Sequence, residues 1–391
     1  MKSLCILGRQ PKLGLAELEA LYGAEHIQSL KGAALLDIEA SEINFKRLGG
    51  SLKVAKILNI LPTTNWAEIF KYLTENIPKH LDYLPAGTFT LGVSLYGFWL
   101  PLQSLNRDLL KIKKIIRDSG RSVRIVPNKT LQLNSAQVLH NKLTSRGAWE
   151  LLLVRDGART ILAQTMFVQD IEAYAKRDQV RPKRDARVGM LPPKLAQIII
   201  NLAKPKAGSR VLDPFCGTGV ILQEALLMGY PVLGSDNNPR MVEYARQNLE
   251  WLRSNQTKEL APSEVKLADA TNHQWPKLET VASEVYLGRP LASLPDEVKL
   301  NQIIRDVNTI TSKFLINIGS QIGKDTCLSL AIPAWHAPRG FKHLPLIDHL
   351  SDLGYNRLSF VHVANEELIY FRPQQIVARE LLILESRRTD E

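Results

Sequence analysis

The pattern of hydrophobic and polar positions in the first 60 residues alternates between the period of a strand and that of a helix. Leu15, Leu18 and Leu21, for example, recur at helical spacing. The elements that the pattern predicts are a strand at 3–8, a helix at 13–22, a strand at 33–38, a short helix at 43–48 and a strand at 52–58. This β-α-β-α-β order predicts a small ferredoxin-like α+β domain over residues 1–60.

The next block, residues 61–170, combines an alternating strand at 89–96 with an amphipathic helix at 105–118. One side of this helix has Leu109, Ile112, Ile115 and Ile116, and the other side has Arg107, Lys111, Lys113, Lys114 and Arg117. We interpret the block as a second domain. The segment that follows, 171–188, is rich in charge and proline and is predicted to be a linker, with Tyr174 available to stack on a nucleic-acid base.

From Pro192 onward strand-like and helical patterns alternate, which is typical of a parallel sheet covered by helices on both faces. Strands are predicted near 209–213, 231–236, 264–268, 280–287 and 326–332, followed by a helix at 343–353, a strand at 357–363 and a strand, a turn and a strand over 367–384. The sequence therefore predicts an α/β domain in the second half of the chain.

The composition is that of a globular protein, with 45% hydrophobic and 23% charged residues among 391. No apolar run approaches the roughly 18 residues of a membrane span, and the apolar core of the first eight residues is short for a secretory signal. Cys5, Cys216 and Cys327 are far apart and lack metal-ligand spacing. We expect a cytoplasmic protein with reduced thiols, no bound metal and no membrane partner.

The net charge of +11 is distributed unevenly along the chain. Residues 1–188 have 28 Lys and Arg against 17 Asp and Glu, whereas residues 189–391 have 22 of each, so the whole excess lies in the first half. A basic module joined to a neutral one favours a polyanionic partner such as RNA, because Lys and Arg neutralise phosphates. Solubility alone is the alternative explanation.

A Gly-rich turn, Asp213-Pro-Phe-Cys-Gly-Thr-Gly219, separates a predicted strand from a predicted helix. Glycine lets a ligand approach the backbone closely, and a strand-to-helix turn is where open α/β sheets bind nucleotides. Two further acids, Asp236 and Asp269, follow the next two predicted strands. A carboxylate at the end of the second strand suits a ribose diol, because it accepts hydrogen bonds from both hydroxyls.

The amino-acid sequence of this turn resembles motif I of the S-adenosylmethionine-dependent methyltransferases that modify exocyclic amines of nucleic-acid bases. The lead-in at 189–203 resembles the helix before motif I in the THUMP-domain tRNA guanine methyltransferases. The resemblance implies a seven-stranded Rossmann-like methyltransferase domain at 189–391 and a THUMP-like RNA-binding domain at 61–170. A Rossmann turn for another nucleotide is the alternative.

The resemblance also implies how the cofactor S-adenosyl-L-methionine is bound. Asp213 and the glycines would face its methionine part, Asp236 its ribose and Asp269 its adenine amine. The cofactor-binding residues implied are Asp213, Pro214, Phe215, Gly217, Gly219, Asp236, Asn237, Asp269 and Ala270. Cys216 is interpreted as a packing residue.

Members of the resembled family have a catalytic motif after the fourth strand, with Asp, Asn or Ser, then two prolines and an aromatic residue. Here the matching stretch is Ser283-Glu284-Val285-Tyr286, so the acceptor and the aromatic are present and the prolines are absent. Prolines would fix φ and stiffen the loop. The catalytic candidates are therefore Ser283, Glu284 and Tyr286, with Glu284 as acceptor if the register is displaced by one residue. A weakened or inactive enzyme is the other interpretation.

The sequence thus predicts a tRNA methyltransferase that transfers a methyl group from S-adenosylmethionine to the exocyclic N2 amine of a guanosine. Two alternatives stay open. One is a catalytically weakened RNA-binding protein that retains the cofactor site, and the other is a DNA amino-methyltransferase, since motif I is shared.

Overall fold

The computed structural model of the chain describes residues 1–185, 190–276, 278–324 and 326–387. These residues divide into two compact units. Unit 1 comprises Met1–Pro11, Glu25–Phe45 and Ser51–Glu172, and unit 2 comprises Lys12–Ala24, Lys46–Gly50 and the described residues from Ala173 onward. Two short N-terminal segments therefore pack with the C-terminal part, while the domain boundaries at residues 60, 170 and 188 stay predictions.

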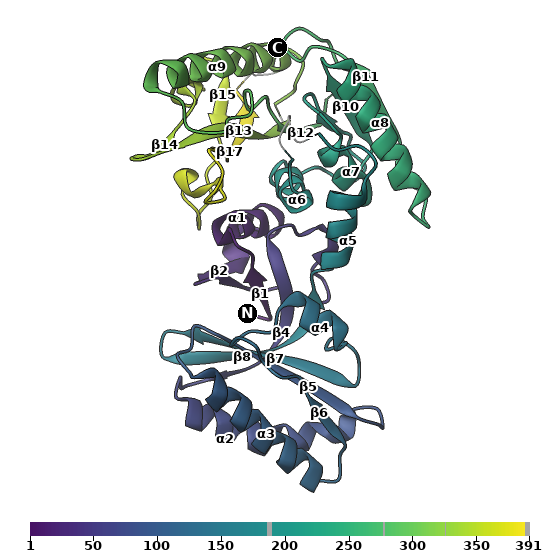
Figure 1. Ribbon diagram of the computed structural model, residues 1–391, viewed down its shortest axis with the longest axis vertical. Coiled ribbons are helices and arrows are strands. Elements are labelled where there is room, and N and C mark those ends of the chain that lie inside the picture. The colour runs from purple at the N-terminus through teal and green to yellow at the C-terminus, as the bar shows by residue number, and fades with distance from the viewer. Residues whose placement is uncertain (186–189, 277, 325, 388–391) are drawn as a thin grey trace. The chain divides into compact units, whose positions relative to one another are not determined.

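Unit 1 is built on a mixed eight-stranded sheet with the strand order β2-β3-β1-β4-β8-β7-β5-β6 (Figure 1). Its strands are β1 Ser3–Leu7, β2 Ile27–Leu30, β3 Ala33–Leu36, β4 Ser51–Leu61, β5 Phe89–Tyr96, β6 Val123–Ile125, β7 Ala148–Asp156 and β8 Arg159–Val168. β4 pairs with β1 on one side and with β8 on the other, so one sheet runs through both predicted N-terminal domains.

The prediction of a helix at 43–48 is wrong. Only a 3-10 turn, Phe45–Arg47, forms there, because Gly49 and Gly50 follow and glycine disfavours helix.

The helices of unit 1 are α2 Trp66–Asn76, α3 Leu102–Asp118 and α4 Ser135–His140. α2 and α3 lie side by side on one face of the sheet (Figure 1). The predicted amphipathic helix is α3, which buries Leu109, Ile112 and Ile116 in the core. Ile115, predicted on the same side, is 37% exposed, because its neighbour Ile116 occupies the buried direction.

The segment predicted as a linker, 171–188, is helical in its described first part, with α5 Ile171–Ala175 and a π-helical turn at Lys176–Val180. Its side chains are packed. Arg177 Nε donates to Oε1 of the buried Glu224 at 2.6 Å, and the ring of Tyr174 has the Arg177 guanidinium 4.6 Å and the Lys194 amine 5.1 Å from its centre. Tyr174 is thus engaged and is not available for base stacking. Residues 186–188 of the predicted linker, and Gly189 of the lead-in, lie outside the described residues.

Unit 2 contains the predicted seven-stranded sheet with a reversed last strand, so this part of the fold is confirmed. The strand order is β11-β10-β9-β12-β13-β17-β15, with β14 Gly340–Lys342 and β16 Ile369–Tyr370 added at β13 and β17. The main strands are β9 Val211–Asp213, β10 Val232–Asp236, β11 Ser263–Leu267, β12 Thr280–Glu284, β13 Cys327–Ala337, β15 Tyr355–Arg357 and β17 Val377–Ser386. β9 to β13 are parallel, and β17 is antiparallel to both of its neighbours.

Two predicted elements of unit 2 differ from the structure. The helix predicted at 343–353 is a 3-10 turn, Pro345–His349, whose side chains Leu346 and Leu350 pack into the core. The strand predicted at 357–363 is reduced to β15, which pairs only with the last residues of β17. In both segments tertiary packing overrides the local pattern.

The helices of unit 2 are α1 Pro11–Tyr22, α6 Pro193–Leu202, α7 Val220–Leu227, α8 Pro239–Ser254 and α9 Glu297–Gly319. α9 covers one face of the sheet through Phe314, Leu315 and Ile318, and α6 lies on the opposite face (Figure 1). Glu17 of α1 accepts hydrogen bonds from the backbone of Gly49 and Gly50 and from Asn201 on α6, which ties the N-terminal segments to unit 2. Among the described helices, none combines the length and the apolarity that a membrane span requires.

Candidate functional site

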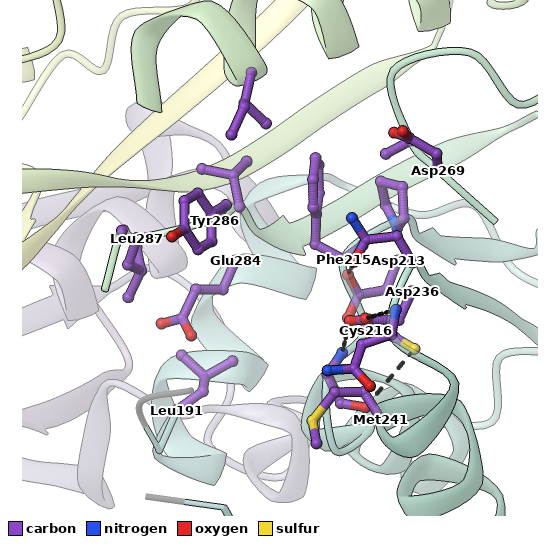
Figure 2. A pocket seen from close by; sticks show the side chains of 18 of the residues that line it. Leu191, Asp213, Phe215, Cys216, Asp236, Met241, Asp269, Glu284, Tyr286 and Leu287 are labelled. Atoms are coloured by element: carbon purple, nitrogen blue, oxygen red, sulfur yellow. Dashed lines mark hydrogen bonds between the residues drawn. The ribbon is translucent and has the colours of Figure 1, made fainter. Parts of the chain in front are cut away.

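A cavity of about 650 Å³ opens at the carboxyl ends of the parallel strands of unit 2, a size typical of small-molecule sites. Figure 2 shows its two ends: Glu284, Tyr286, Leu287 and Leu191 gather at one, and Asp213, Asp236 and Met241 lie at the other. Of the cofactor residues predicted from the sequence, Asp213, Pro214, Phe215, Gly217, Asp236, Asn237, Asp269 and Ala270 line this cavity. Gly219 lies behind the lining, at the start of α7.

The Gly-rich turn is held by backbone bonds that the sequence pattern alone does not reveal. The N–H of Cys216 donates to the carbonyl of Ser235 on β10 at 2.9 Å, and the N–H of Gly219 to the carbonyl of Cys216 at 2.7 Å. Gly217 and Gly219 have φ of +49° and +82°, a region that favours glycine. A Cβ on Gly217 would meet only open space, so the backbone there is exposed to whatever fills the cavity.

Asp236 joins the turn to the end of β10. Its Oδ2 accepts from the N–H of Gly217 at 3.0 Å, and its Oδ1 from the N–H of Asn238 at 2.9 Å. Burial raises the pKa of Asp236 above its usual range, although these two bonds oppose the shift. The carboxylate lines the cavity and keeps unused lone pairs, so it can still accept from a ribose hydroxyl.

Asp213 is the most deeply buried acid of the site. It accepts from the Ser283 hydroxyl at 2.6 Å and from the N–H of Phe215 at 3.3 Å. Burial raises the pKa of Asp213 to about 7, and the negative charges of Asp236 and Glu284 add to the effect. A cationic ligand group beside Asp213 would favour its ionised form.

Asp269 lines the cavity at the turn after β11. Its Oδ1 accepts from the backbone N–H of Thr271 at 2.9 Å and from the Thr271 hydroxyl at 2.8 Å. The carboxylate is exposed and therefore open to a donor such as an adenine amine. Three acids on successive strand ends thus line one wall, which suits a nucleoside with an attached ammonium group.

The three catalytic candidates divide between the cavity and the core. Ser283 is completely buried, is bonded to Asp213 and does not line the cavity. Glu284, the last residue of β12, lines the cavity and is paired with Arg379 of β17, whose Nε donates to Oε1 at 2.9 Å. Tyr286 also lines it and is 39% exposed. The structure thus brings Glu284 and Tyr286 together and separates Ser283 from them.

Some cavity residues escaped the sequence prediction. They include Leu191 and Met241, which form an apolar wall, and Arg289 and Lys313, which are exposed and basic. Arg289 follows Gly288, whose φ is +87°, so a glycine four residues beyond Glu284 was the available signal. Lys313 comes from α9, a helix that the sequence pattern did not locate. In the described part of the chain, no group of three or more His, Cys, Asp and Glu side chains is arranged to hold a metal.

Comparison with known proteins finds similarity in the part of the chain around this cavity. The RMKL-like methyltransferase domain family UPF0020 matches residues 181–274. The tRNA (guanine(10)-N2)-dimethyltransferase of Methanothermobacter thermautotrophicus is 37% identical over 150 residues, which are 36% of this chain and 41% of that protein. The tRNA (guanine(6)-N2)-methyltransferase of Thermus thermophilus is 40% identical over 80 residues, 18% of this chain and 24% of that protein. The matched stretch thus spans less than half the length of these curated relatives.

Two solved structures share the fold over nearly the whole chain. TrmN from Thermus thermophilus superimposes with a TM-score of 0.52 at 17% identity, covering 99% of this chain and 100% of its own. A possible methylase from Clostridium difficile 630 gives a TM-score of 0.50 at 13% identity, covering 100% and 99%. Unit 2 therefore has the Rossmann-like methyltransferase fold. The THUMP-like character of residues 61–170 stays a prediction.

Proposed function

We propose that this protein is an S-adenosylmethionine-dependent tRNA methyltransferase that acts on the exocyclic N2 amine of a guanosine. The observation that carries the proposal is the single cavity joining the acids of three strand ends to Glu284 and Tyr286. The similarity of residues in unit 2 to tRNA guanine-N2 methyltransferases supports the choice of substrate. We place the reaction in the cytoplasm, where tRNA is available.

The acids of the cavity have distinct roles toward the cofactor in this proposal. Asp213 pairs with its ammonium group, Asp236 accepts from the ribose hydroxyls and Asp269 accepts from the adenine amine. Gly217 leaves room for the ligand, because it lines the cavity and has no side chain. When bound, the cofactor supplies an electrophilic methyl group on a sulfonium.

Glu284 and Tyr286 act on the guanine at the other end of the cavity. The amine lone pair is delocalised into the base, so an acceptor must take an amine hydrogen and turn the lone pair toward the methyl carbon. Glu284 is that acceptor, since the Ser283 hydroxyl is committed to Asp213. A bound cofactor would supply the methyl group to the amine nitrogen, and the electron pair of the broken sulfur–methyl bond would stay on its sulfur. One amine proton passes to Glu284 and then to water, while Tyr286 stacks on the base.

Unit 1 holds the tRNA in this proposal. Arg107, Lys111, Lys114 and Arg117 of α3 are exposed on one side of the helix, where they can neutralise backbone phosphates. This contact supplies affinity without reading sequence.

The decisive experiment incubates the purified protein with methyl-labelled cofactor and unmodified tRNA, followed by digestion to nucleosides. Label in N2-methylguanosine or N2,N2-dimethylguanosine is the expected result, and sequencing of the labelled fragment gives the position. Label that appears only with duplex DNA would replace the proposal by the DNA amino-methyltransferase. Binding of both cofactor and tRNA without any transfer would indicate a binding protein. That alternative rests on Glu284 and Val285, which stand where the resembled family has prolines.

A further inference from the structure

Arg379 reaches the candidate acceptor from the reversed strand of the sheet. Its side chain is 5% exposed, and its Nε donates to Oε1 of Glu284, which is 13% exposed, at 2.9 Å. β13 lies between the two residues: Glu284 is paired with Ala331, and Arg379 with Pro333 of the same strand. The backbones of β12 and β17 are thus two strand spacings apart, about 10 Å. The long arginine side chain spans this gap.

Stability alone does not explain such a pair. Burying two charges costs desolvation that their attraction often fails to exceed, and apolar replacements of buried ion pairs are frequently neutral or stabilising. Ala331 and Leu381, which lie in register with Glu284, are apolar and completely buried. A buried pair whose acid lines a ligand cavity therefore indicates a role in what the cavity does.

The pair also lies where the chain departs from the methyltransferase pattern. Glu284 and Val285 stand at the positions of two prolines that would fix the loop through their restricted φ. Without them, a glutamate with three side-chain torsions would be free to leave the cavity. The bond from Arg379 restricts those torsions directly.

We propose that Arg379 is a positioning residue that holds the Glu284 carboxylate at the acceptor end of the cavity, replacing the stiffness of the absent prolines. This inference rests on the proposed function, in which Glu284 accepts the amine hydrogen. Arg379 acts through Glu284 and itself contacts neither the base nor the cofactor.

The pKa of Glu284 depends on the charges around it, so a change in this pKa distinguishes a positioning arginine from a merely structural one. Arg379 of β17 is bonded to it, Asp213 of β9 interacts with it electrostatically, and the same cavity is lined by Asp236, Asp269, Tyr286, Arg289 and Lys313. Burial raises the pKa of Glu284, and Arg379 lowers it. Removing Arg379 must therefore raise this pKa further. As the pH falls, activity that needs the ionised carboxylate will then be lost at a higher pH than in the wild type.

The test compares Arg379→Gln with Arg357→Gln in the full-length protein. Arg357 is the matched control, because it makes a partly buried bond at 3.1 Å to Glu380, a carboxylate of β17, and does not touch Glu284. Arg379→Gln should lower kcat about ten- to a hundredfold, shift the acid limb of the pH profile upward and leave cofactor affinity within about twofold. Arg357→Gln should keep the kcat and the pH profile of the wild type. Arg379→Lys, which retains the charge, should recover part of kcat.

A double variant separates positioning from an independent effect. Glu284→Gln/Arg379→Gln should be no slower than Glu284→Gln alone, since Arg379 has nothing left to hold. Additive losses, or an Arg379→Gln enzyme with unchanged kcat and acid limb, would overturn the proposal.

A measurement independent of turnover keeps this inference distinct from the proposed function. Carboxyl-carbon NMR of protein labelled at glutamate, with Glu284→Gln for assignment, gives the pKa of Glu284 directly. A higher pKa of Glu284 in Arg379→Gln supports the role of Arg379, whether or not tRNA is methylated. If no tRNA is methylated, the proposed function alone fails. An unchanged pKa refutes the role of Arg379 even if the wild type is active.

Discussion

At the scale of single residues, the role of each carboxylate in the site depends on its hydrogen-bond partner. Asp213 and Glu284 lie at the ends of neighbouring strands, yet one is bonded to a buried serine and the other to an arginine across the sheet. This difference separates a cofactor-side acid from an acceptor. It also gives Ser283 and Glu284, adjacent in sequence, effects that can be measured separately.

Glu284→Gln keeps the size of the side chain and removes its charge. It should slow methyl transfer about ten- to a thousandfold at saturating cofactor, because the carboxylate stabilises the developing positive amine. Ser283→Ala is the matched variant. It removes the hydroxyl bond to Asp213 and should weaken cofactor binding by about 1–2 kcal/mol while the saturated rate is kept. Single-turnover rates and calorimetry check both, and a reversed pattern would make Ser283 the acceptor.

The pKa of Asp213, raised to about 7 by burial, predicts a pH dependence of cofactor binding. Below that pH the carboxyl is protonated in the free protein, and a bound ammonium favours the ionised form. Affinity should therefore rise roughly tenfold between pH 5.5 and 7.0. Asp213→Asn should bind more weakly and lose this dependence. Calorimetry at the two pH values tests it, and equal affinities in the wild type would contradict the role of Asp213.

The same shift affects the ligand-free protein with a definite sign. The folded pKa lies above the ordinary value of an aspartate, so the folded state binds the proton more tightly than the unfolded state. The stabilisation is present below the ordinary pKa of about 4 and is lost as pH rises toward 7. The free energy of unfolding should therefore decrease over that range, and by less in Asp213→Asn.

At the scale of elements, the connection from β9 to α7 is the most constrained segment of the site. The turn between them is bonded to β10 through the carbonyl of Ser235 and through Asp236, so it is fixed by the neighbouring strand. α7 begins at Gly219 in a left-handed conformation and close to α8. The position at which α7 starts is therefore fixed by its neighbours.

Gly219→Ala should destabilise this segment in two ways. Its φ of +82° strains an alanine by about 1–2 kcal/mol, and the new Cβ would lie 3.3 Å from the Cβ of Ala245. Gly229→Ala is the control, because φ is +90° there but no atom lies within 4 Å of the new Cβ. Chemical denaturation should show a larger loss for Gly219→Ala, together with weaker cofactor binding. Equal losses would mean that the contact with α8 costs nothing.

At the scale of the whole molecule, charge and chemistry are on different parts of the chain. The net charge of +11 is contributed by residues 1–188, whereas the cavity belongs to unit 2. The proposed function therefore combines a basic first half of the chain, which binds the polyanion, with residues 189–391, which have no net charge and line the cavity.

Reversing charge on α3 should weaken tRNA binding and leave the cavity intact. Lys114→Glu/Arg117→Glu should lower affinity at least about tenfold and reduce the slope of log affinity against log salt by about 2. Lys299→Glu/Arg305→Glu on the exposed side of α9 is the matched control. Filter binding over a salt series measures both. An equal loss in the two double variants would show that binding depends on net charge and has no preferred surface.

The sequence by itself determined the order of the main strands in the second half, the Gly-rich turn and the three acids at strand ends. These features are local: a turn needs glycine at particular positions, and a parallel sheet leaves consecutive strand ends at one edge. The same local reasoning failed at 43–48 and 343–353, where glycines and core packing removed the predicted helices.

Only the tertiary structure decided what depends on contacts between distant residues. Segments 12–24 and 46–50 pack with unit 2 because Glu17 is bonded to Asn201, 184 positions away. Ser283 and Glu284 were equivalent candidates until the sheet placed Asp213 beside one and Arg379, 95 positions away, beside the other. Strand pairing sets those neighbours, and pairing is fixed by the burial of whole faces rather than by any local pattern.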